Sequence, residues 1–310
     1  MSSIPDKQYV FVVGAPRSGT TWLHRMLAEH PSVASINAEL TLFSSYLAPV
    51  VKRFKDETFH RDRGHWDQGL PMLFSQQEFD SAIRSVTGMT YARVLNKNPA
   101  ASHILDKHPA YSLHIPLIDQ LLPNSRFIHI IRDGREVVVS MMSAKRRLGF
   151  GEGDVRGASL DWANHIRQAR AEGSKLGASR YMEVSYEALM ETRGSLLKDV
   201  FDFAGLPLTD TEIGQIASKH AIDNQQVSGG DAALNKLRKI PGAIWRSKLT
   251  LQERWTLDEL VGDLLFELEQ ARPGWWALNA SERRTMTYRR LKIRARQSVR
   301  ELLHLRIPTR

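Results

Sequence analysis

The amino-acid sequence predicts an α/β fold, in which helices flank both faces of a central parallel sheet. Three apolar segments, residues 9–13, 125–134 and 179–189, carry this prediction, because each leads into a turn and a segment with helical periodicity. Uninterrupted apolar segments of this length are typical of strands buried on both faces. Strands that alternate with helices build parallel sheets, and such sheets bind their ligands beyond the carboxyl ends of the strands.

A glycine-rich loop follows the first of these strands. Gly14 and Gly19 have the spacing of the phosphate-binding loop G-x-x-x-x-G-K-[ST], and Thr21 fills its hydroxyl position. Thr20 stands where that loop has its lysine, and Arg17 supplies a cation within the loop instead. The sequence therefore predicts a P-loop-like domain that lacks the lysine used by nucleoside triphosphatases.

The composition of this loop suits an oxyanion. Its glycines let successive backbone N–H groups point inward, and the helix predicted over residues 20–30 adds its positive N-terminal end. The hydroxyl of Ser18 is a further donor. A glycine-rich turn without a ligand is the alternative, and the combination of strand, spacing, hydroxyls and helix disfavours it.

The second strand also ends at a candidate anion site. Arg132 closes the segment 125–134, and Ser140 lies eight residues further, inside the helix predicted over residues 136–147. An arginine offers a bidentate fork to a phosphate, and a serine adds a hydroxyl. Taken with the first loop, these two residues predict a ligand with two separated anionic groups.

The other segments complete a single domain over residues 1–280. Apolar stripes at residues 196–204 and 257–268 predict two further helices. Residues 41–96 are polar, aromatic and irregular, and we expect a largely helical insertion that forms a lid or a wall of the substrate site. Residues 281–310 are predicted to form a separate basic, amphipathic C-terminal helix.

The positive charge is concentrated in that C-terminal segment. Of a net charge of +9, residues 281–310 carry +8, from ten Lys or Arg and two Glu. Because the body is nearly neutral, the net charge is no argument that it binds nucleic acid, and no specific nucleic-acid partner is predicted. We expect the basic helix to pack on the body or on a second subunit, with contact to an anionic membrane surface as the alternative.

The composition also restricts the chemistry and the compartment. The chain has no cysteine, which excludes disulfides, iron–sulfur clusters and thiolate zinc sites, and no metal site is predicted. We find no apolar run of about 18 residues and no secretory signal at the N-terminus. We therefore expect a cytoplasmic protein, with peripheral contact at the inner membrane surface through the basic helix as the alternative.

The two loops together resemble those of the sulfotransferases that use 3′-phosphoadenosine 5′-phosphosulfate (PAPS). That family has [KR]-x-G-T-T at the 5′-phosphosulfate, and this sequence has "RSGTT", Arg17 to Thr21. The family's 3′-phosphate motif is an arginine at a strand end and a serine eight residues on, which Arg132 and Ser140 match. The motif style is similar to that of the bacterial and tyrosylprotein branches. The resemblance implies adenosine 3′,5′-bisphosphate as product and no metal requirement.

Further segments are similar to the family in a looser way. In "DKHPAYSLHI", Lys107 matches a lysine that reaches toward the transferred group. Tyr186 and Trp22 match aromatic residues that pack near the adenine. Arg238 and Lys239 belong to "RKIPGAIWRSKLT", which looks like the segment that closes over the 3′-phosphate, although Ile240 replaces the family's glycine.

The resemblance implies transfer by in-line displacement, with Arg17 and Lys107 stabilising charge on the sulfonate. Glu39 is our candidate base for a hydroxyl acceptor, because a glutamate holds a similar place in tyrosylprotein sulfotransferases. His108 is the rival base. It lies one residue after Lys107, where cytosolic members have a histidine two residues on, and this shift predicts that it faces elsewhere.

Two other functions compete with this prediction. A P-loop nucleoside or sugar kinase needs magnesium chemistry, and the first loop lacks its lysine. A non-catalytic nucleotide- or polyanion-binding protein is supported by the basic C-terminal segment alone. The sequence does not name the acceptor, for which a carbohydrate, a lipid, a peptide and a small metabolite all stay open.

Overall fold

A computed structural model describes residues 5–149, 151–192, 194–221, 244–280 and 282–284. The chain divides into two compact units, Met1–Lys248 and Leu249–Arg310. The boundary that we predicted between residues 280 and 281 falls inside the second unit. All of the candidate site residues belong to the first.

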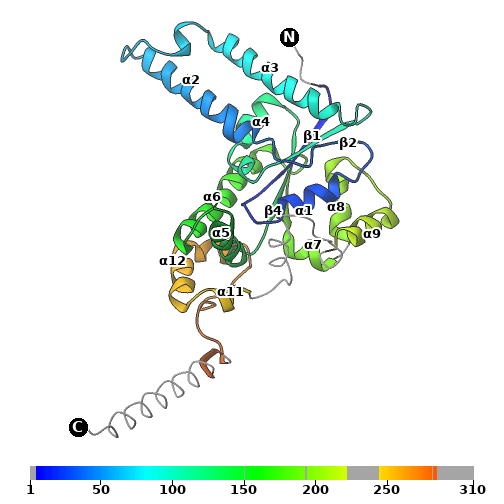
Figure 1. The fold of residues 1–310 in the computed structure, drawn as a ribbon, viewed down its shortest axis with the longest axis vertical. Helices are drawn as coiled ribbons and strands as arrows, with labels where there is room; N and C mark the ends of the chain where they lie inside the picture. Colours follow the sequence, from blue (N-terminus) through cyan, green and yellow to red (C-terminus); the bar gives the residue numbers. More distant parts are fainter. Residues whose placement is uncertain (1–4, 150, 193, 222–243, 281, 285–310) are drawn as a thin grey trace, which may run out of the picture. The chain divides into compact units, whose positions relative to one another are not determined.

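The first unit is built on a parallel sheet of five strands in the order β2-β3-β1-β4-β5 (Figure 1). These strands are β1 (Gln8–Val13), β2 (Val33–Ala34), β3 (His103–Lys107), β4 (Arg126–Ile131) and β5 (Tyr181–Ser185). Every pairing is parallel, so the carboxyl ends of the strands meet at one edge. The predicted fold class is thereby confirmed. Two of the strands, β2 and β3, were missing from the prediction.

Helices connect the strands and cover both faces of the sheet. In this unit they are α1 (Thr20–Leu27), α2 (Ala48–Arg61), α3 (Gln76–Leu95), α4 (Ile115–Leu121), α5 (Gly134–Leu148), α6 (Val155–Gly173), α7 (Tyr186–Thr192), α8 (Ser195–Ala204), α9 (Asp210–Lys219) and α11 (Ile244–Lys248). Four short turns of helix are η1 (Leu42–Leu47), η2 (Leu70–Met72), η3 (Pro109–Leu113) and η4 (Ser174–Leu176).

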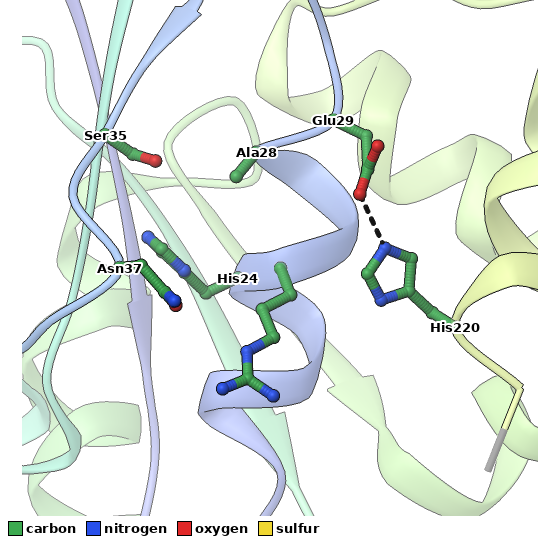
Figure 2. Close-up of a pocket in the computed structure, with 7 residues that line it drawn as sticks. His24, Ala28, Glu29, Ser35, Asn37 and His220 are labelled. Carbon is green, nitrogen blue, oxygen red and sulfur yellow. Dashed lines mark hydrogen bonds and ion pairs between the residues drawn. The ribbon is translucent and has the colours of Figure 1, made fainter. Parts of the chain in front are cut away.

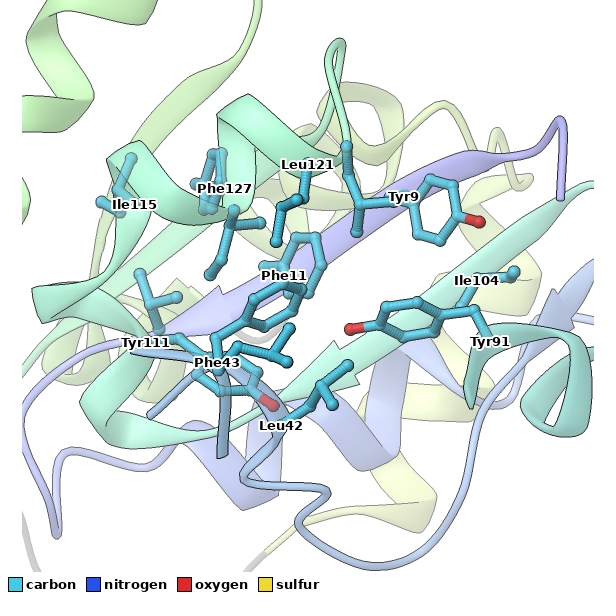
Figure 3. Close-up of a cluster of buried hydrophobic side chains, with 14 of the residues drawn as sticks. Tyr9, Phe11, Leu42, Phe43, Tyr91, Ile104, Tyr111, Ile115, Leu121 and Phe127 are labelled. Atoms are coloured by element: carbon cyan, nitrogen blue, oxygen red, sulfur yellow. The ribbon is translucent and has the colours of Figure 1, made fainter. Parts of the chain in front are cut away.

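The alternation of side chains along β1 separates two hydrophobic cores. Phe11 points to one face, where it packs among aromatic rings that include Phe43 and Tyr111 (Figure 3). Val10 and Val12 point to the other face, toward α1, α7, α8 and α9. Because both faces are covered, the strand can be apolar without interruption, as the sequence pattern predicted.

The predicted insertion at residues 41–96 is largely helical. It contains η1, α2, η2 and α3, and the rings of Phe54 and Phe79 stack at 3.8 Å where α2 meets α3. Ser75 begins α3 with a capping box, in which Ser75 and Glu78 bond each other's backbone N–H groups. Large exposed apolar side chains are frequent here, among them Trp66 and Leu73.

Two predicted boundaries are wrong. The first helix ends at Leu27 and not at residue 30: beyond it, the N–H groups of Glu29 and His30 bond the carbonyl oxygens of Met26 and Leu27, three residues back, and Pro31 has no N–H to continue the helix. The segment 179–189 is a strand only to Ser185. There the Ser185 Oγ accepts a hydrogen bond from the N–H of Ala188 and starts α7, so Tyr186 lies on a helix.

The second unit contains α12 (Leu251–Glu267), which confirms the helix predicted over residues 257–268. Thr250 and Glu253 form a capping box at its start, and Trp275 donates a 2.7 Å hydrogen bond to Asp258 of the same unit. Of the predicted basic C-terminal helix, residues 281 and 285–310 lie outside the described residues. In the part of the chain that the structure describes, no helix has the length and apolar character needed to cross a membrane.

Candidate active site

The first loop joins β1 to α1 at the carboxyl edge of the sheet. Gly14 lies so close to β4 that a Cβ atom there would come within 2.5 Å of the Ile130 carbonyl oxygen. Gly19 has φ of +101° and is the N-cap of α1, and a Cβ atom there would meet the ring of Tyr186 at 2.7 Å. Both positions therefore require glycine for space as well as for backbone conformation.

Arg17 adopts a left-handed backbone conformation with φ of +72°. A non-glycine residue pays for this conformation with strain, and such strain is found mostly at functional positions. The conformation turns the Arg17 side chain toward α5, where Nε donates a 3.1 Å hydrogen bond to Ser140 Oγ.

Ser18 has the buried hydroxyl of this loop. Its side chain is fully buried, and among the described residues its Oγ has no hydrogen-bond partner. The helix α1 that follows begins without a side-chain cap. A buried donor with no partner beside an uncapped helix N-terminus is an arrangement that an anion would complete.

The second loop lies directly beside the first, since β4 is the neighbour of β1. Arg132 is 7% exposed, and its Nη1 donates a 3.2 Å hydrogen bond to the carbonyl oxygen of Arg17. Within the described part of the chain, the Arg132 Nε is buried without a partner. Asp133 caps α5 by accepting a hydrogen bond from the N–H of Arg135, which places Ser140 two turns into that helix.

Tyr186 and Trp22 pack against these loops. The guanidinium carbon of Arg132 lies 4.7 Å from the centre of the Tyr186 ring, a cation–π contact. Trp22 meets the same ring edge to face at 5.4 Å, and its Nε1–H donates a 2.9 Å hydrogen bond to the carbonyl oxygen of His220. The structure thus brings together both aromatic residues and both loops that the sequence singled out.

The end of β3 places Lys107 on the other side of the first loop. Lys107 is 5% exposed, and its ammonium group forms a short ion pair with Glu39 Oε1. Glu39 Oε2 lies 3.5 Å from His108 Nε2, and His108 Nδ1 lies 3.4 Å from Ser44 Oγ. Our prediction that His108 faces elsewhere is therefore wrong, because the extended backbone at His108 turns its ring back toward Glu39.

Burial affects the protonation of His108. It lowers the pKa of the imidazole, although the nearby Glu39 carboxylate acts in the opposite direction. A neutral imidazole at neutral pH can accept a proton. Both candidate bases, Glu39 and His108, therefore lie in one cluster with Lys107.

Asp106 is a residue of this region that the sequence analysis missed. Its Oδ2 accepts hydrogen bonds from the hydroxyls of Tyr91 (2.9 Å) and Tyr111 (3.3 Å), and its Oδ1 accepts one from the N–H of Lys107 (2.7 Å). Burial raises the pKa of Asp106 to about 6. The carboxylate ties the insertion, through Tyr91 of α3, to the strand end that carries Lys107. The sequence signal that could have identified Asp106 is an acidic residue within an otherwise apolar segment.

The basic segment "RKIPGAIWRSKLT", residues 238–250, lies only partly within the described residues. Arg238 and Lys239 lie outside the described residues. Trp245 of α11 does pack on α5, where the guanidinium carbon of Arg135 lies 4.7 Å from its ring and Glu136 accepts a 3.4 Å hydrogen bond from its N–H. In the described residues, no three His, Asp or Glu side chains are grouped so as to hold a metal ion.

The comparisons with known proteins agree with this fold. Residues 9–210 match the model of the sulfotransferase family. Because this match covers more than half of the 310 residues, the chain belongs to the sulfotransferase family. It is therefore an enzyme that transfers a sulfonate group, and the kinase and the non-catalytic binding protein are not favoured.

Relatives are found among the protein-tyrosine sulfotransferases. The chain is 26% identical to a putative protein-tyrosine sulfotransferase of Caenorhabditis briggsae, over 74% of this chain and 73% of that protein. It is 24% identical to protein-tyrosine sulfotransferase 2 of Gallus gallus, over 85% of this chain and 67% of that protein.

Solved structures of sulfotransferases share the fold. Mouse sulfotransferase SULT7A1, in a complex with PAP, has a TM-score of 0.55 and 14% identity, over 86% of this chain and 87% of that one. Sulfotransferase STF9 of Mycobacterium avium has a TM-score of 0.51 and 16% identity, over 85% and 77% of the two chains. At these identities the likeness concerns the fold, which agrees with the α/β prediction.

Proposed function

We propose that the protein transfers the sulfonate group of PAPS to a hydroxyl or amine of an acceptor and releases adenosine 3′,5′-bisphosphate. The observation that carries this proposal is a pair of buried donors, Ser18 Oγ and Arg132 Nε, that have no partner among the described residues. They belong to two neighbouring loops at one sheet edge, where an anionic nucleotide would satisfy both. The mouse relative in a complex with PAP supports the choice of nucleotide.

Each of the two loops would bind one anionic group of the nucleotide. The first loop, from Arg17 to Thr21, would hold the 5′-phosphosulfate with its N–H groups, hydroxyls and helix N-terminus. Arg132 and Ser140 would hold the 3′-phosphate. The ring of Tyr186, packed against Arg132, and the neighbouring Trp22 would border the adenine.

The charged residues near the end of β3 would take part in the transfer of the sulfonate group. When bound, PAPS supplies a sulfur atom that the acceptor attacks while the bond from sulfur to the 5′-phosphate oxygen breaks. Arg17 and Lys107 would stabilise the negative charge, so that no metal is required. Glu39 would take the acceptor's proton, and its ion pair with Lys107 and its approach to His108 support this role.

The acceptor would lie near the insertion at residues 41–96. Ser44, at the start of that insertion, lies within 3.4 Å of His108, and Tyr91 of α3 bonds Asp106 beside Lys107. The insertion thus contacts the reacting residues directly, which supports its role as a wall of the acceptor site. The names of the relatives make a tyrosine in a protein one candidate acceptor.

Nucleotide binding tests this proposal without knowledge of the acceptor. Calorimetric titration of the full chain with adenosine 3′,5′-bisphosphate should give saturable binding, and thermal shift should show stabilisation. ATP with magnesium and an RNA oligomer are the comparison ligands. Stabilisation by ATP with magnesium, without any effect of the bisphosphate, would overturn the proposal.

Two arginine variants make the test specific for the site. Arg132→Ala should weaken bisphosphate binding by about 10-fold to 100-fold, the usual cost of a lost charged hydrogen bond. The matched control is Arg180→Ala, since the Arg180 guanidinium pairs with Asp119, a residue that belongs to neither loop. Equal affinities for the two variants would show that the nucleotide does not bind at Arg132.

A further inference from the structure

The insertion at residues 41–96 presents many large apolar side chains to solvent. Among the described residues, it holds ten of the fifteen such side chains that are exposed. Six of them gather in residues 59–74, which we call the hairpin tip: Phe59, Trp66, Leu70, Met72, Leu73 and Phe74. Such a concentration of exposed apolar side chains is typical of an interaction surface.

The hairpin tip is the end of the insertion that lies away from the sheet. The helices α2 and α3 pack on each other, and Figure 1 shows that residues 62–75 join them at the end far from the strands. The other end of the insertion reaches the candidate reacting residues, where Ser44 approaches His108. The apolar side chains of the tip therefore form a surface distinct from the acceptor wall proposed above.

The hairpin tip is also distinct from the cavity beside α1. That cavity has a volume of about 260 Å³ and a mainly polar lining, to which His24, Ser35 and Asn37 belong (Figure 2). None of the six apolar side chains of the tip lines it. Leu73 of the tip is 79% exposed, the highest value among the exposed large apolar side chains of the described residues. The tip therefore offers its apolar side chains to a partner outside the chain.

Hydrogen bonds within the hairpin tip hold these side chains in place. Arg61 Nη1 donates a 2.6 Å hydrogen bond to the carbonyl oxygen of Pro71. The carbonyl oxygen of Leu70 accepts hydrogen bonds from the N–H groups of Leu73 (2.9 Å) and Phe74 (3.0 Å). The exposed apolar side chains are thus presented by a built turn, and a surface that is ordered before binding loses less entropy when its partner binds.

The composition of the hairpin tip suits the boundary between water and lipid. The guanidinium carbon of Arg63 lies 3.6 Å from the centre of the Phe59 ring, and the ring of Trp66 lies 4.0 Å from that of His60. Amphipathic rings and long cationic side chains are favoured at the level of lipid headgroups, where one end of the side chain is apolar and the other is hydrated.

The tip itself carries no net charge, since two arginines balance two aspartates in residues 59–74. Of these, Arg61 and Asp62 are paired at 2.9 Å. A neutral tip with exposed apolar side chains can enter the headgroup region without taking an unbalanced charge into it. The tip would therefore supply the apolar part of membrane binding, and the electrostatic part must come from elsewhere in the chain.

The charge of the chain favours an anionic bilayer over a second copy as the partner. The chain has a net charge of +9, of which residues 281–310 supply +8. A second copy carries the same positive charge and repels the first, whereas anionic headgroups attract it. An apolar anchor combined with a basic segment supplies the two signals that stable membrane association requires.

We propose that the hairpin tip inserts its apolar side chains into the interface of an anionic lipid bilayer and so holds the enzyme at a membrane surface. The positive charge of residues 281–310 adds electrostatic attraction to the same surface. This inference concerns the place where the enzyme is held, and it depends neither on the acceptor nor on the nucleotide. Self-association through the tip and purely electrostatic binding through the basic segment are the competing explanations.

The first experiment measures binding of the full chain to lipid vesicles by co-sedimentation. Vesicles made of equal parts of phosphatidylglycerol and phosphatidylcholine are compared with vesicles of phosphatidylcholine alone. We expect binding to the anionic vesicles, weaker binding to the neutral ones, and a loss of this difference at high salt. Absence of binding to the anionic vesicles would overturn the inference, and equal binding to both at low salt would contradict the choice of an anionic surface.

The second experiment tests the part of the hairpin tip in this binding. Leu70→Ser and Leu73→Ser should each weaken binding to anionic vesicles by about tenfold, the usual value of one leucine side chain taken out of water. The matched control is Leu160→Ser, since Leu160 of α6 and Leu70 are both 44% exposed. Equal binding by all three variants would show that the basic segment binds the vesicles without the tip.

A fluorescent label reports insertion directly. Because the chain has no cysteine, Leu73→Cys and Leu160→Cys each provide a single site for an environment-sensitive dye. With anionic vesicles, the emission of the dye at position 73 should shift to shorter wavelength and increase, whereas the dye at position 160 should not respond. No response at position 73, or an equal response at both positions, would contradict insertion of the tip.

Light scattering separates the bilayer from a second copy as the partner. We expect the chain without vesicles to have the same oligomeric state as its Leu70→Ser and Leu73→Ser variants. If the unaltered chain is a dimer that these variants convert to a monomer, and their vesicle binding is unchanged, the tip binds a second copy and the inference is wrong.

Discussion

Arg17 donates a hydrogen bond from Nε to Ser140 Oγ at 3.1 Å and so connects two loops that lie 123 residues apart in the chain. Arg132 strengthens the connection by donating a 3.2 Å hydrogen bond to the Arg17 carbonyl oxygen. The sequence assigned Arg17 to the 5′-phosphosulfate and Arg132 with Ser140 to the 3′-phosphate, yet these residues form one cluster. In the proposed complex, the two anionic groups of the nucleotide would bind to different members of this cluster.

The contact predicts energetic coupling between Arg17 and Ser140. In a double-mutant cycle of Arg17→Gly and Ser140→Ala, the effects on the binding free energy of adenosine 3′,5′-bisphosphate should deviate from additivity by about 0.5–3 kcal/mol. Calorimetric titration of the four proteins measures this. The control cycle uses Ser143→Ala, because Ser143 lies on the same helix and bonds Arg147 instead. Additive effects in both cycles would contradict the coupling.

The left-handed backbone of Arg17 predicts that replacing it with glycine affects stability and turnover differently. Arg17→Gly should leave the free energy of unfolding unchanged or raise it, because glycine adopts φ of +72° without strain. Turnover should nevertheless fall by about 10²–10³, the usual cost of one group that stabilises a developing negative charge. Urea unfolding and steady-state kinetics measure the two quantities. A turnover equal to that of the unaltered chain would remove Arg17 from the mechanism.

The cluster of Glu39, Lys107 and His108 predicts which residue accepts the proton. Glu39→Gln keeps the shape of the side chain and should lower kcat by about 10²–10⁴, as expected for the loss of a general base. His108→Gln should have a smaller effect, and the double variant should be no slower than Glu39→Gln. These values are measured as kcat over a range of pH. A larger loss in His108→Gln than in Glu39→Gln would reverse the assignment.

The buried carboxyl of Asp106 predicts a specific pH dependence of stability. Burial raises its pKa from 3.8 to about 6, so between these values the folded state binds more protons than the unfolded state. Its contribution is therefore fully favourable below pH 3.8 and is lost as the pH rises through about 6. The difference corresponds to about 3 kcal/mol at most.

Asp106→Asn isolates this contribution, because an amide does not titrate. The difference in free energy of unfolding between Asp106→Asn and the unaltered chain should change between pH 4 and pH 7, with the variant relatively more stable at the higher pH. Urea unfolding at a series of pH values measures this difference. A pH-independent difference would show that Asp106 titrates normally in the folded chain.

Local patterns sufficed for much of the fold and for the two loops. The strand β1 and the glycines at 14 and 19 follow one another in the chain, so their spacing and apolar pattern are visible in a short segment. The same holds for Arg132 and Ser140, which are separated by two turns of one helix. The strand β3 was missed, because it ends in Asp106 and Lys107, two charged residues that are buried.

Those two residues are buried because distant segments satisfy them. Tyr91 of the insertion bonds Asp106, and Glu39 pairs with Lys107. No local pattern contains these partners, since they depend on which segments the sheet brings together. For the same reason the spacing of His108 after Lys107 led to a wrong prediction of its direction, which the contact with Glu39 corrects.

The sequence by itself determined the α/β class, the position of the two candidate anion loops and the likeness to the sulfotransferases, because each depends on residues that are neighbours along the chain. The tertiary structure decided that Arg17 meets Ser140 and that Glu39 meets both Lys107 and His108. The physical reason is the strand order β2-β3-β1-β4-β5. It sets which strand ends adjoin, and the periodicity of a single strand or helix carries no information about its neighbours.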